Sequence, residues 1–96
     1  MEDGKRKELN RRVDEILYYL WDPIGVNDEP AARSEYAGYV WNVFAKLISN
    51  EGNEALTELL LSFEKENMGL PGNVEHAKKI SGILIDAMHA VDEGLS

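Results

Sequence analysis

The sequence predicts an all-α fold, specifically a compact four-helix, up-and-down-like bundle with an apolar loop between the first two helices. Apolar residues recur at spacings of three and four in four separate segments, which is the pattern of helices with one buried side. No segment alternates apolar and polar residues with a period of two, so we expect no strands. The connections are short, and helices joined in this way usually lie antiparallel to their neighbours. We expect one helical domain over residues 1–96, frayed at 1–4 and 94–96.

The first helix is predicted to end near Trp21 or Asp22. Its apolar stripe consists of Leu9, Val13, Ile16, Leu17, Leu20 and Trp21. Asp22 precedes Pro23, and a residue before proline is disfavoured in the α region. The loop that follows, residues 22–29, is unusual because Ile24 gives it an apolar character beside several turn-forming residues. We expect this loop either to plug the core or to contact a partner.

The second helix is predicted to begin at Pro30, because the first position of a helix does not need a backbone N–H. Its stripe is rich in aromatic residues and comprises Tyr36, Tyr39, Val40, Val43, Phe44, Leu47 and Ile48. Asn50 or Gly52 should end this helix, since both residue types accept a left-handed backbone.

A third and a fourth helix fill the second half of the chain. Asn53 is the expected N-cap of the third helix, and Gly69, followed by Pro71, is its expected end. The stripe of this helix is Leu56, Leu59, Leu60 and Phe63. Asn73 should cap the fourth helix. The inward face of that helix is predicted to contain Val74, Ala77, Ile80, Ile83 or Leu84, Ala87, Met88 and Val91.

Composition excludes several classes of function. The chain contains no cysteine, which rules out disulfides, thiolate metal sites and cysteine nucleophiles. Its formal net charge is −8, so it lacks the cationic surface that nucleic-acid phosphates require. No apolar run approaches the roughly 20 residues of a transmembrane helix, and no signal segment follows the charged N-terminus. We therefore expect a cytoplasmic protein that binds neither nucleic acid nor membrane.

No group of residues matches a catalytic or cofactor motif, and we expect no cofactor and no metal. Asp86 and His89 share a helical face, but metal sites in bundles need a second copy of this motif and inward-facing glutamates on other helices. Asp22, Asp28 and Glu35 define the alternative function, a small-molecule or metal-dependent enzyme with a site beside the loop. Their spacing does not match a Ca²⁺-binding loop, and helix capping explains them without a ligand.

Aromatic residues gather between positions 18 and 44 and supply the candidate partner-binding residues. Trp41, and either Tyr18 or Tyr19, fall outside the predicted buried stripes. Exposed tryptophan and tyrosine are typical interface anchors, and rings that lie flat on the bundle surface are the alternative. The candidate partner-binding residues are Tyr18, Tyr19, Trp21, Ile24, Tyr39 and Trp41.

Three short motifs resemble those of a family of small uncharacterised bacterial all-helical proteins with a Trp-Asp-Pro-Ile-Gly loop. The residues that carry the resemblance are Leu20-Trp21-Asp22-Pro23-Ile24-Gly25-Val26, then Pro30, Glu35-Tyr36 and Tyr39, and finally Met68-Gly69-Leu70. They span most of the chain from about Ile16 to Leu70. The resemblance implies a helical fold and a bacterial origin, and it implies no reaction.

Together these observations favour a non-catalytic protein-interaction module whose partner is another protein. The net charge favours a basic partner, because an acidic body attracts cations. An immunity-type protein that binds and masks a toxin is the more specific hypothesis, drawn from the small size and the acidic charge. The enzyme described above and a structural homo-oligomer are the alternatives.

Overall fold

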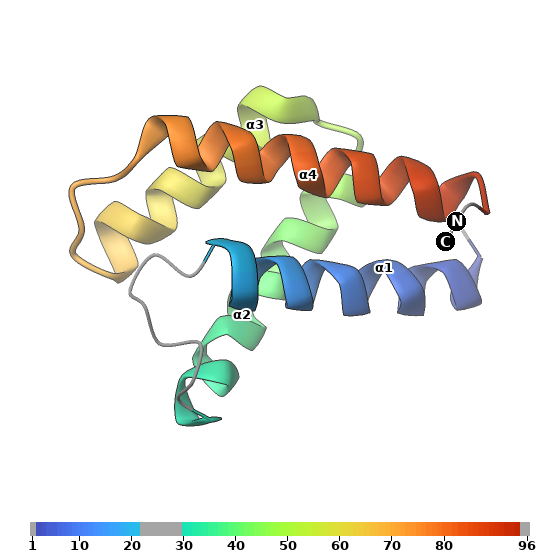
Figure 1. Cartoon of the computed structure of the whole chain (residues 1–96), viewed down its shortest axis with the longest axis horizontal. Helices are drawn as coiled ribbons and strands as arrows, with labels where there is room; N and C mark the ends of the chain where they lie inside the picture. The colour runs from blue at the N-terminus through green and yellow to red at the C-terminus, as the bar shows by residue number, and fades with distance from the viewer. Residues whose placement is uncertain (1, 22–29, 95–96) are drawn as a thin grey trace.

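Within residues 2–21 and 30–94, the computed structural model contains four α-helices, two of which continue into π-helical turns (Figure 1). These ranges are the residues that the structure describes, except for the side chains of residues 30–36 and 67. The helices are α1 (Asp3–Glu15) with its π-helical continuation η1 (Ile16–Trp21), α2 (Pro30–Ile48), α3 (Gly52–Ser62) with its π-helical continuation η2 (Phe63–Asn67), and α4 (Val74–Asp92). The described residues form no strand, which confirms the predicted all-α helical bundle.

The first and last helices lie side by side. α1 and α4 run antiparallel in Figure 1, and α2 and α3 lie behind them. α4 packs against α3 as well as α1, and α2 packs against α1 and α3. The Nζ of Lys5 donates a hydrogen bond to the carbonyl oxygen of Asp92 at 2.7 Å, which joins the start of α1 to the end of α4. The termini of the described chain therefore meet at one end of the bundle.

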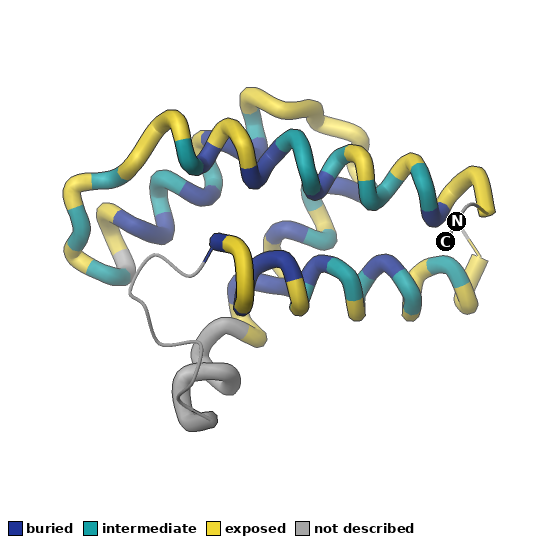
Figure 2. Tube along the Cα trace, in the orientation of Figure 1, coloured by how far each residue is buried: buried dark blue, intermediate teal, exposed yellow. Residues whose placement is uncertain are grey.

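The core lies where the apolar stripes of the four helices face one another (Figure 2). Its buried apolar residues are Leu9, Val13, Ile16, Leu17, Tyr18, Trp21, Tyr39, Val40, Val43, Leu47, Leu56, Leu60, Phe63, Ala77, Ile80, Leu84 and Val91. Burial of such side chains is the main favourable term in folding, at about 25 cal/mol per Å² of apolar surface. No helix in the described part of the chain combines the length and the apolar character needed to cross a bilayer.

Most helix boundaries lie where the local sequence predicts them. α2 begins at Pro30, and the helix ends coincide with left-handed backbone at Asn50 (φ 59°) and Gly69 (φ 68°). Asn73 caps α4, because its side chain accepts a hydrogen bond from the backbone N–H of His76 at 3.1 Å.

Two details of the third and fourth helices differ from the prediction. Asn53 is not an N-cap, because α3 already begins at Gly52 and Asn53 lies in the first turn. There its backbone oxygen accepts a hydrogen bond from the Oγ1 of Thr57 at 2.9 Å. Val74 was predicted to face inward, but it is exposed. It is the first residue of α4, ahead of Ala77, where the buried face of this helix begins.

Candidate functional site

The structure divides the predicted partner-binding residues into a buried group and an exposed group. Trp21 is 1% exposed, and Tyr18 and Tyr39 are also buried, so these three rings belong to the core. Tyr19 is 57% exposed and Trp41 is 67% exposed. The sixth residue of the set, Ile24, lies outside the described residues. Only Tyr19 and Trp41 therefore have surface available to a partner among the described members of this set.

Trp21 is the centre of a buried aromatic cluster, which we define as Trp21, Tyr39 and Phe63. The ring centroids of Trp21 and Tyr39 are 5.8 Å apart with an interplanar angle of 87°, and those of Trp21 and Phe63 are 6.1 Å apart. Tyr39 and Phe63 are 4.5 Å apart. Edge-to-face pairs, such as those that Trp21 forms with Tyr39 and with Phe63, contribute about 0.5–1.5 kcal/mol beyond their buried area. The cluster joins η1, α2 and η2 in the interior.

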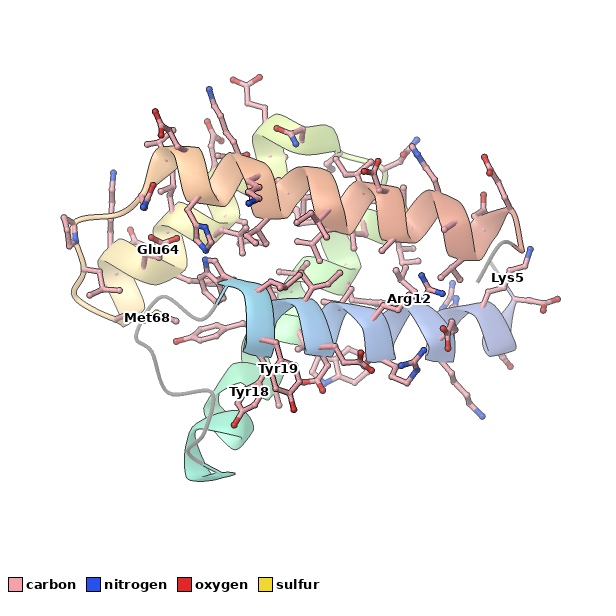
Figure 3. The ribbon with its side chains drawn as sticks, in the orientation of Figure 1. Lys5, Arg12, Tyr18, Tyr19, Glu64 and Met68 are labelled. Carbon is pink, nitrogen blue, oxygen red and sulfur yellow. The ribbon has the colours of Figure 1, made fainter. Side chains whose placement is uncertain are left out.

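A buried carboxylate completes this junction. Glu64 is only 2% exposed, and its Oε2 accepts a hydrogen bond from the indole Nε1–H of Trp21 at 3.0 Å. Its Oε1 accepts a second bond from the backbone N–H of Asn73 at 3.0 Å. The Nε2 of His76 lies 3.1 Å from the carbonyl oxygen of Trp21. Figure 3 shows Glu64 between the end of η1 and the start of α4, where these bonds hold three segments together.

Glu64 was not among the residues predicted from the sequence, although its position in the chain carries a signal. Leu56, Leu60 and Glu64 are spaced by four, so they lie along one ridge of a helix, and the two leucines are buried. A glutamate that continues a buried ridge is unusual because charged residues are almost never fully buried unless they are paired. Its donors, however, come from distant parts of the chain, and no local pattern identifies them.

A cavity of about 650 Å³ opens beside this junction and is lined in part by Trp21, Glu64, Asn73 and His76. Both oxygens of the Glu64 carboxylate already accept hydrogen bonds. No group of three or more possible metal-ligating side chains occurs among the described residues. The contacts of Glu64 are therefore those of a structural residue that accepts hydrogen bonds from the buried indole N–H of Trp21 and the backbone N–H of Asn73.

The structure describes almost nothing of the residues that define the alternative enzyme site. Asp22 and Asp28 lie outside the described residues, and Glu35 is described only as a backbone position in α2. Asp86 and His89 are both exposed on α4. The hypothesis of a site beside Asp22, Asp28 and Glu35 thus stays a prediction.

The outward face of α2 is the most distinctive surface of the described chain. Residues 37–45 contain no charged side chain, whereas 29% of the whole sequence is charged. The exposed residues of this stretch, which we call the α2 face, are Ala37, Gly38, Trp41, Asn42 and Ala45. The ring of Trp41 packs edge-on against Phe44, with centroids 6.4 Å apart and an interplanar angle of 82°. Depletion of charge around an aromatic residue is typical of the centre of a protein interface.

Gly38 adds a second unusual feature to the α2 face. A glycine inside a helix is destabilising by about 0.5–1 kcal/mol relative to alanine. A Cβ atom built on Gly38 would meet no other atom within 4 Å, so the packing of this fold does not require glycine there. Ala37 and Ala45 are the other small exposed residues of this face. Glycine permits close approach of another backbone or ligand, which a larger side chain would prevent.

A groove runs along one edge of the α2 face, between α1 and α2. It has a volume of about 350 Å³ and is lined by Arg6, Lys7, Asn10, Trp41 and Phe44. Its walls therefore combine two aromatic rings from α2 with two cationic side chains from α1. Pockets of about 300–1,000 Å³ accommodate drug-sized ligands, and this groove lies at the lower limit of that range.

A second groove of about 420 Å³ lies between α1–η1 and α4, and the exposed side chains of Tyr19 and Leu20 contribute to it. Its cationic residues are paired within the chain. Arg11 forms ion pairs with Glu8 and Glu15, and the remaining lining arginine, Arg12, bonds Glu8. The hydrogen bonds from Arg11, and then from Arg12, lower the pKa of Glu8 below its usual value. The charges of this groove are thus largely balanced.

Comparison with protein-family models, curated proteins and solved structures finds no match to this chain. The resemblance to small bacterial proteins with a Trp-Asp-Pro-Ile-Gly loop remains an expectation from the sequence.

Proposed function

We propose that this protein is a non-catalytic protein-interaction module that binds its partner through the α2 face. The observation that carries the proposal is the exposure of Trp41, at 67%, within a stretch of helix that has no charged side chain. Removing a ring of this size from water favours association by about 25 cal/mol per Å² of apolar area. Tryptophan is also enriched among the few residues that dominate binding energy at interfaces.

The positions of the two tryptophans support this proposal. Trp21 and Glu64 are engaged with each other in the interior, whereas Trp41 contacts Phe44 on the surface. The two tryptophans thus have separate roles, one in stability and one in recognition.

An immunity-type role, in which the module binds and masks a toxin, is our more specific hypothesis within this class. It is supported by the small size of the chain and its net charge of −8. Co-expression with the product of an adjacent gene tests it. Restored growth of the host cell is the expected result, and unrelieved toxicity contradicts this role without affecting the broader proposal.

Affinity capture from the source cell, with the full chain as bait, tests the broader proposal. Trp41→Ala is compared with Val74→Ala, which removes an exposed apolar side chain from the start of α4 instead. We expect a stoichiometric protein partner that the unchanged chain and Val74→Ala retain and Trp41→Ala loses. Far-UV circular dichroism checks that both variants fold. A partner held equally by both variants, or no stoichiometric partner at physiological salt, contradicts the proposal.

A further inference from the structure

We propose that the cavity beside Glu64 binds a small organic cation, an ammonium group carried on an aliphatic stem. The described residues that line this cavity include none from the α2 face, so the inference is independent of the proposed function. Glu64 supplies a buried negative charge at the cavity. It is only 2% exposed, and both of its oxygens accept hydrogen bonds from N–H groups, which is the pattern of an ionised carboxylate.

The charge of Glu64 has no cationic partner among the described residues. The ion-paired acids in that part of the chain are Glu8, Glu15 and Glu51. The donors to Glu64 are instead a neutral indole and a neutral backbone amide. Buried charges in proteins are normally paired, because removal of an ion from water is costly. The adjoining cavity is the space from which a cationic ligand can supply the missing partner.

The start of α4 compensates this charge only in part. The N-terminus of a helix acts as about half a positive charge, and Glu64 reaches it through the backbone N–H of Asn73. Glu75, in the first turn of α4, is a second carboxylate that lines the cavity. No lysine or arginine occurs among the described lining residues. The cavity therefore favours a cation.

His76 supplies a further acceptor at the cavity. Its Nε2 lies 3.1 Å from the carbonyl oxygen of Trp21, and because a carbonyl oxygen only accepts, this nitrogen carries the hydrogen atom. In the neutral imidazole the Nδ1 is then an acceptor. An ammonium group has three N–H donors and no acceptor, so it complements an imidazole nitrogen and a carboxylate together.

The walls of the cavity explain the aliphatic stem. Trp21 and Glu64 are almost fully buried and mark its inner end, whereas Pro71 and Val74 are exposed and mark its mouth. Leu70, which is partly buried, adds to the apolar lining. A ligand that enters here places its stem against apolar side chains and its charged head at Glu64. The volume of about 650 Å³ lies within the range of about 300–1,000 Å³ for small-molecule pockets.

Titration of the full chain with the pentylammonium ion, followed by heteronuclear NMR at low salt, tests the proposal. Pentanol and pentanoate are the matched probes, because they carry the same stem with a neutral and an anionic head. We expect pentylammonium to shift the indole N–H of Trp21 and the backbone N–H of Asn73, which are both bonded to Glu64. It should bind at least about fivefold more tightly than pentanol. The indole N–H of Trp41 is the internal control and should stay in place.

Two substitutions that each remove one carboxylate test the charge. Glu75→Gln, at the cavity, is compared with Glu93→Gln, at the opposite end of α4. Both residues are exposed, so both variants should fold. The affinity for pentylammonium should fall about two- to fivefold in Glu75→Gln, as for an exposed ion pair, and less than about 1.5-fold in Glu93→Gln. Glu64→Gln, measured below its lowered Tm, should lose at least about fivefold.

Three results overturn the proposal: equal shifts with pentanol or pentanoate, equal affinities of Glu75→Gln and Glu93→Gln, and a Trp21 signal that does not move. N-acetyl-lysinamide separates two sources of the same chemistry. If it binds as tightly as pentylammonium, the cavity accepts a lysine side chain of a protein, and if it binds more weakly, the cavity accepts a free amine. A partner that ignores Trp41→Ala contradicts the proposed function and does not affect this cavity.

Discussion

The hydrogen bond between Trp21 and Glu64 gives the sharpest prediction about stability. In Glu64→Gln, an NH₂ group replaces one of the two acceptor oxygens that face the N–H groups of Trp21 and Asn73. One buried donor then loses its partner, at a cost of about 1–3 kcal/mol. Glu64→Ala removes both acceptors, so we expect roughly twice that loss, about 2–6 kcal/mol.

These losses are large for a chain of this length. A domain of 96 residues has an expected free energy of unfolding of about 5–14 kcal/mol. Each kcal/mol lost lowers the Tm by about 4–8 °C in a domain of this size. Glu64→Gln should therefore remain folded at room temperature with a clearly lower Tm, whereas Glu64→Ala should approach the limit of folding.

Urea denaturation followed by far-UV circular dichroism measures these changes. The control is Glu66→Gln, an exposed residue in the same π-helical segment, for which we expect a change within about 0.5 kcal/mol. A double-mutant cycle with Trp21→Phe, which removes the indole donor, isolates the bond between Trp21 and Glu64. We expect a coupling energy of about 1.5–3 kcal/mol, the range for hydrogen bonds to charged groups. Equal effects of Glu64→Gln and Glu66→Gln, or a coupling energy near zero, would refute the structural role of this carboxylate.

Three further predictions concern the surface and the core. Gly38→Ala should raise the free energy of unfolding by about 0.5–1 kcal/mol while it weakens partner binding; equal binding would contradict close approach at the α2 face. Hydrogen bonds from Arg11 and Arg12 lower the pKa of Glu8 in the folded protein. These bonds therefore stabilise the fold fully at pH values above the pKa that Glu8 has in the unfolded chain, and this stabilisation is lost as the pH falls through the lower pKa of Glu8 in the folded protein. Comparing Glu8→Gln with the unchanged chain across acidic pH should show a stability difference that disappears at the acidic end, and a constant difference would refute this cause. Leu84→Ala, at a fully buried position of α4, should cost about 2–5 kcal/mol, and thermal melting that shows almost no change would contradict the core assignment.

The helix boundaries were predictable because short-range chemistry decides them. Pro30 starts a helix, Gly69 ends one with a left-handed backbone, and Asn73 caps one through its own side chain. None of these effects depends on a distant part of the chain. Asn53 was the exception, since the turn at Asn50 delivers the chain into α3 two residues earlier than the cap position predicts.

The orientation of the aromatic residues at the end of the first helix was not predictable. The π-helical bonding of η1 changes the phase of the helix, so that Ile16, Leu17 and Tyr18 are all buried and Tyr19 is turned outward. In a regular α-helix three consecutive residues span about 200° of the circumference, which is wider than the stripe of roughly 100° that an amphipathic pattern predicts. The pairing of Glu64 with Trp21 likewise depends on tertiary packing across 43 positions of the chain.

The candidate binding surface was partly predictable. Trp41 falls outside the buried stripe of its helix, which identified it as an exposed ring from the sequence alone. The groove beside it was not predictable, because Arg6 and Lys7 reach Trp41 only through the packing of α1 on α2. The sign of the charge next to the aromatic anchor is thus a property of the tertiary structure.

The two tryptophans allow one measurement to test the division between recognition and stability. The chain contains two tryptophans and therefore two indole N–H groups. That of Trp21 is buried and bonded to Glu64, and that of Trp41 belongs to the exposed ring on α2. Their NMR signals are assigned with Trp41→Phe and followed while the native partner is added. We predict that the signal of Trp41 shifts or broadens while that of Trp21 stays in place. A shift of the Trp21 signal with an unchanged Trp41 signal would show that the ligand enters elsewhere.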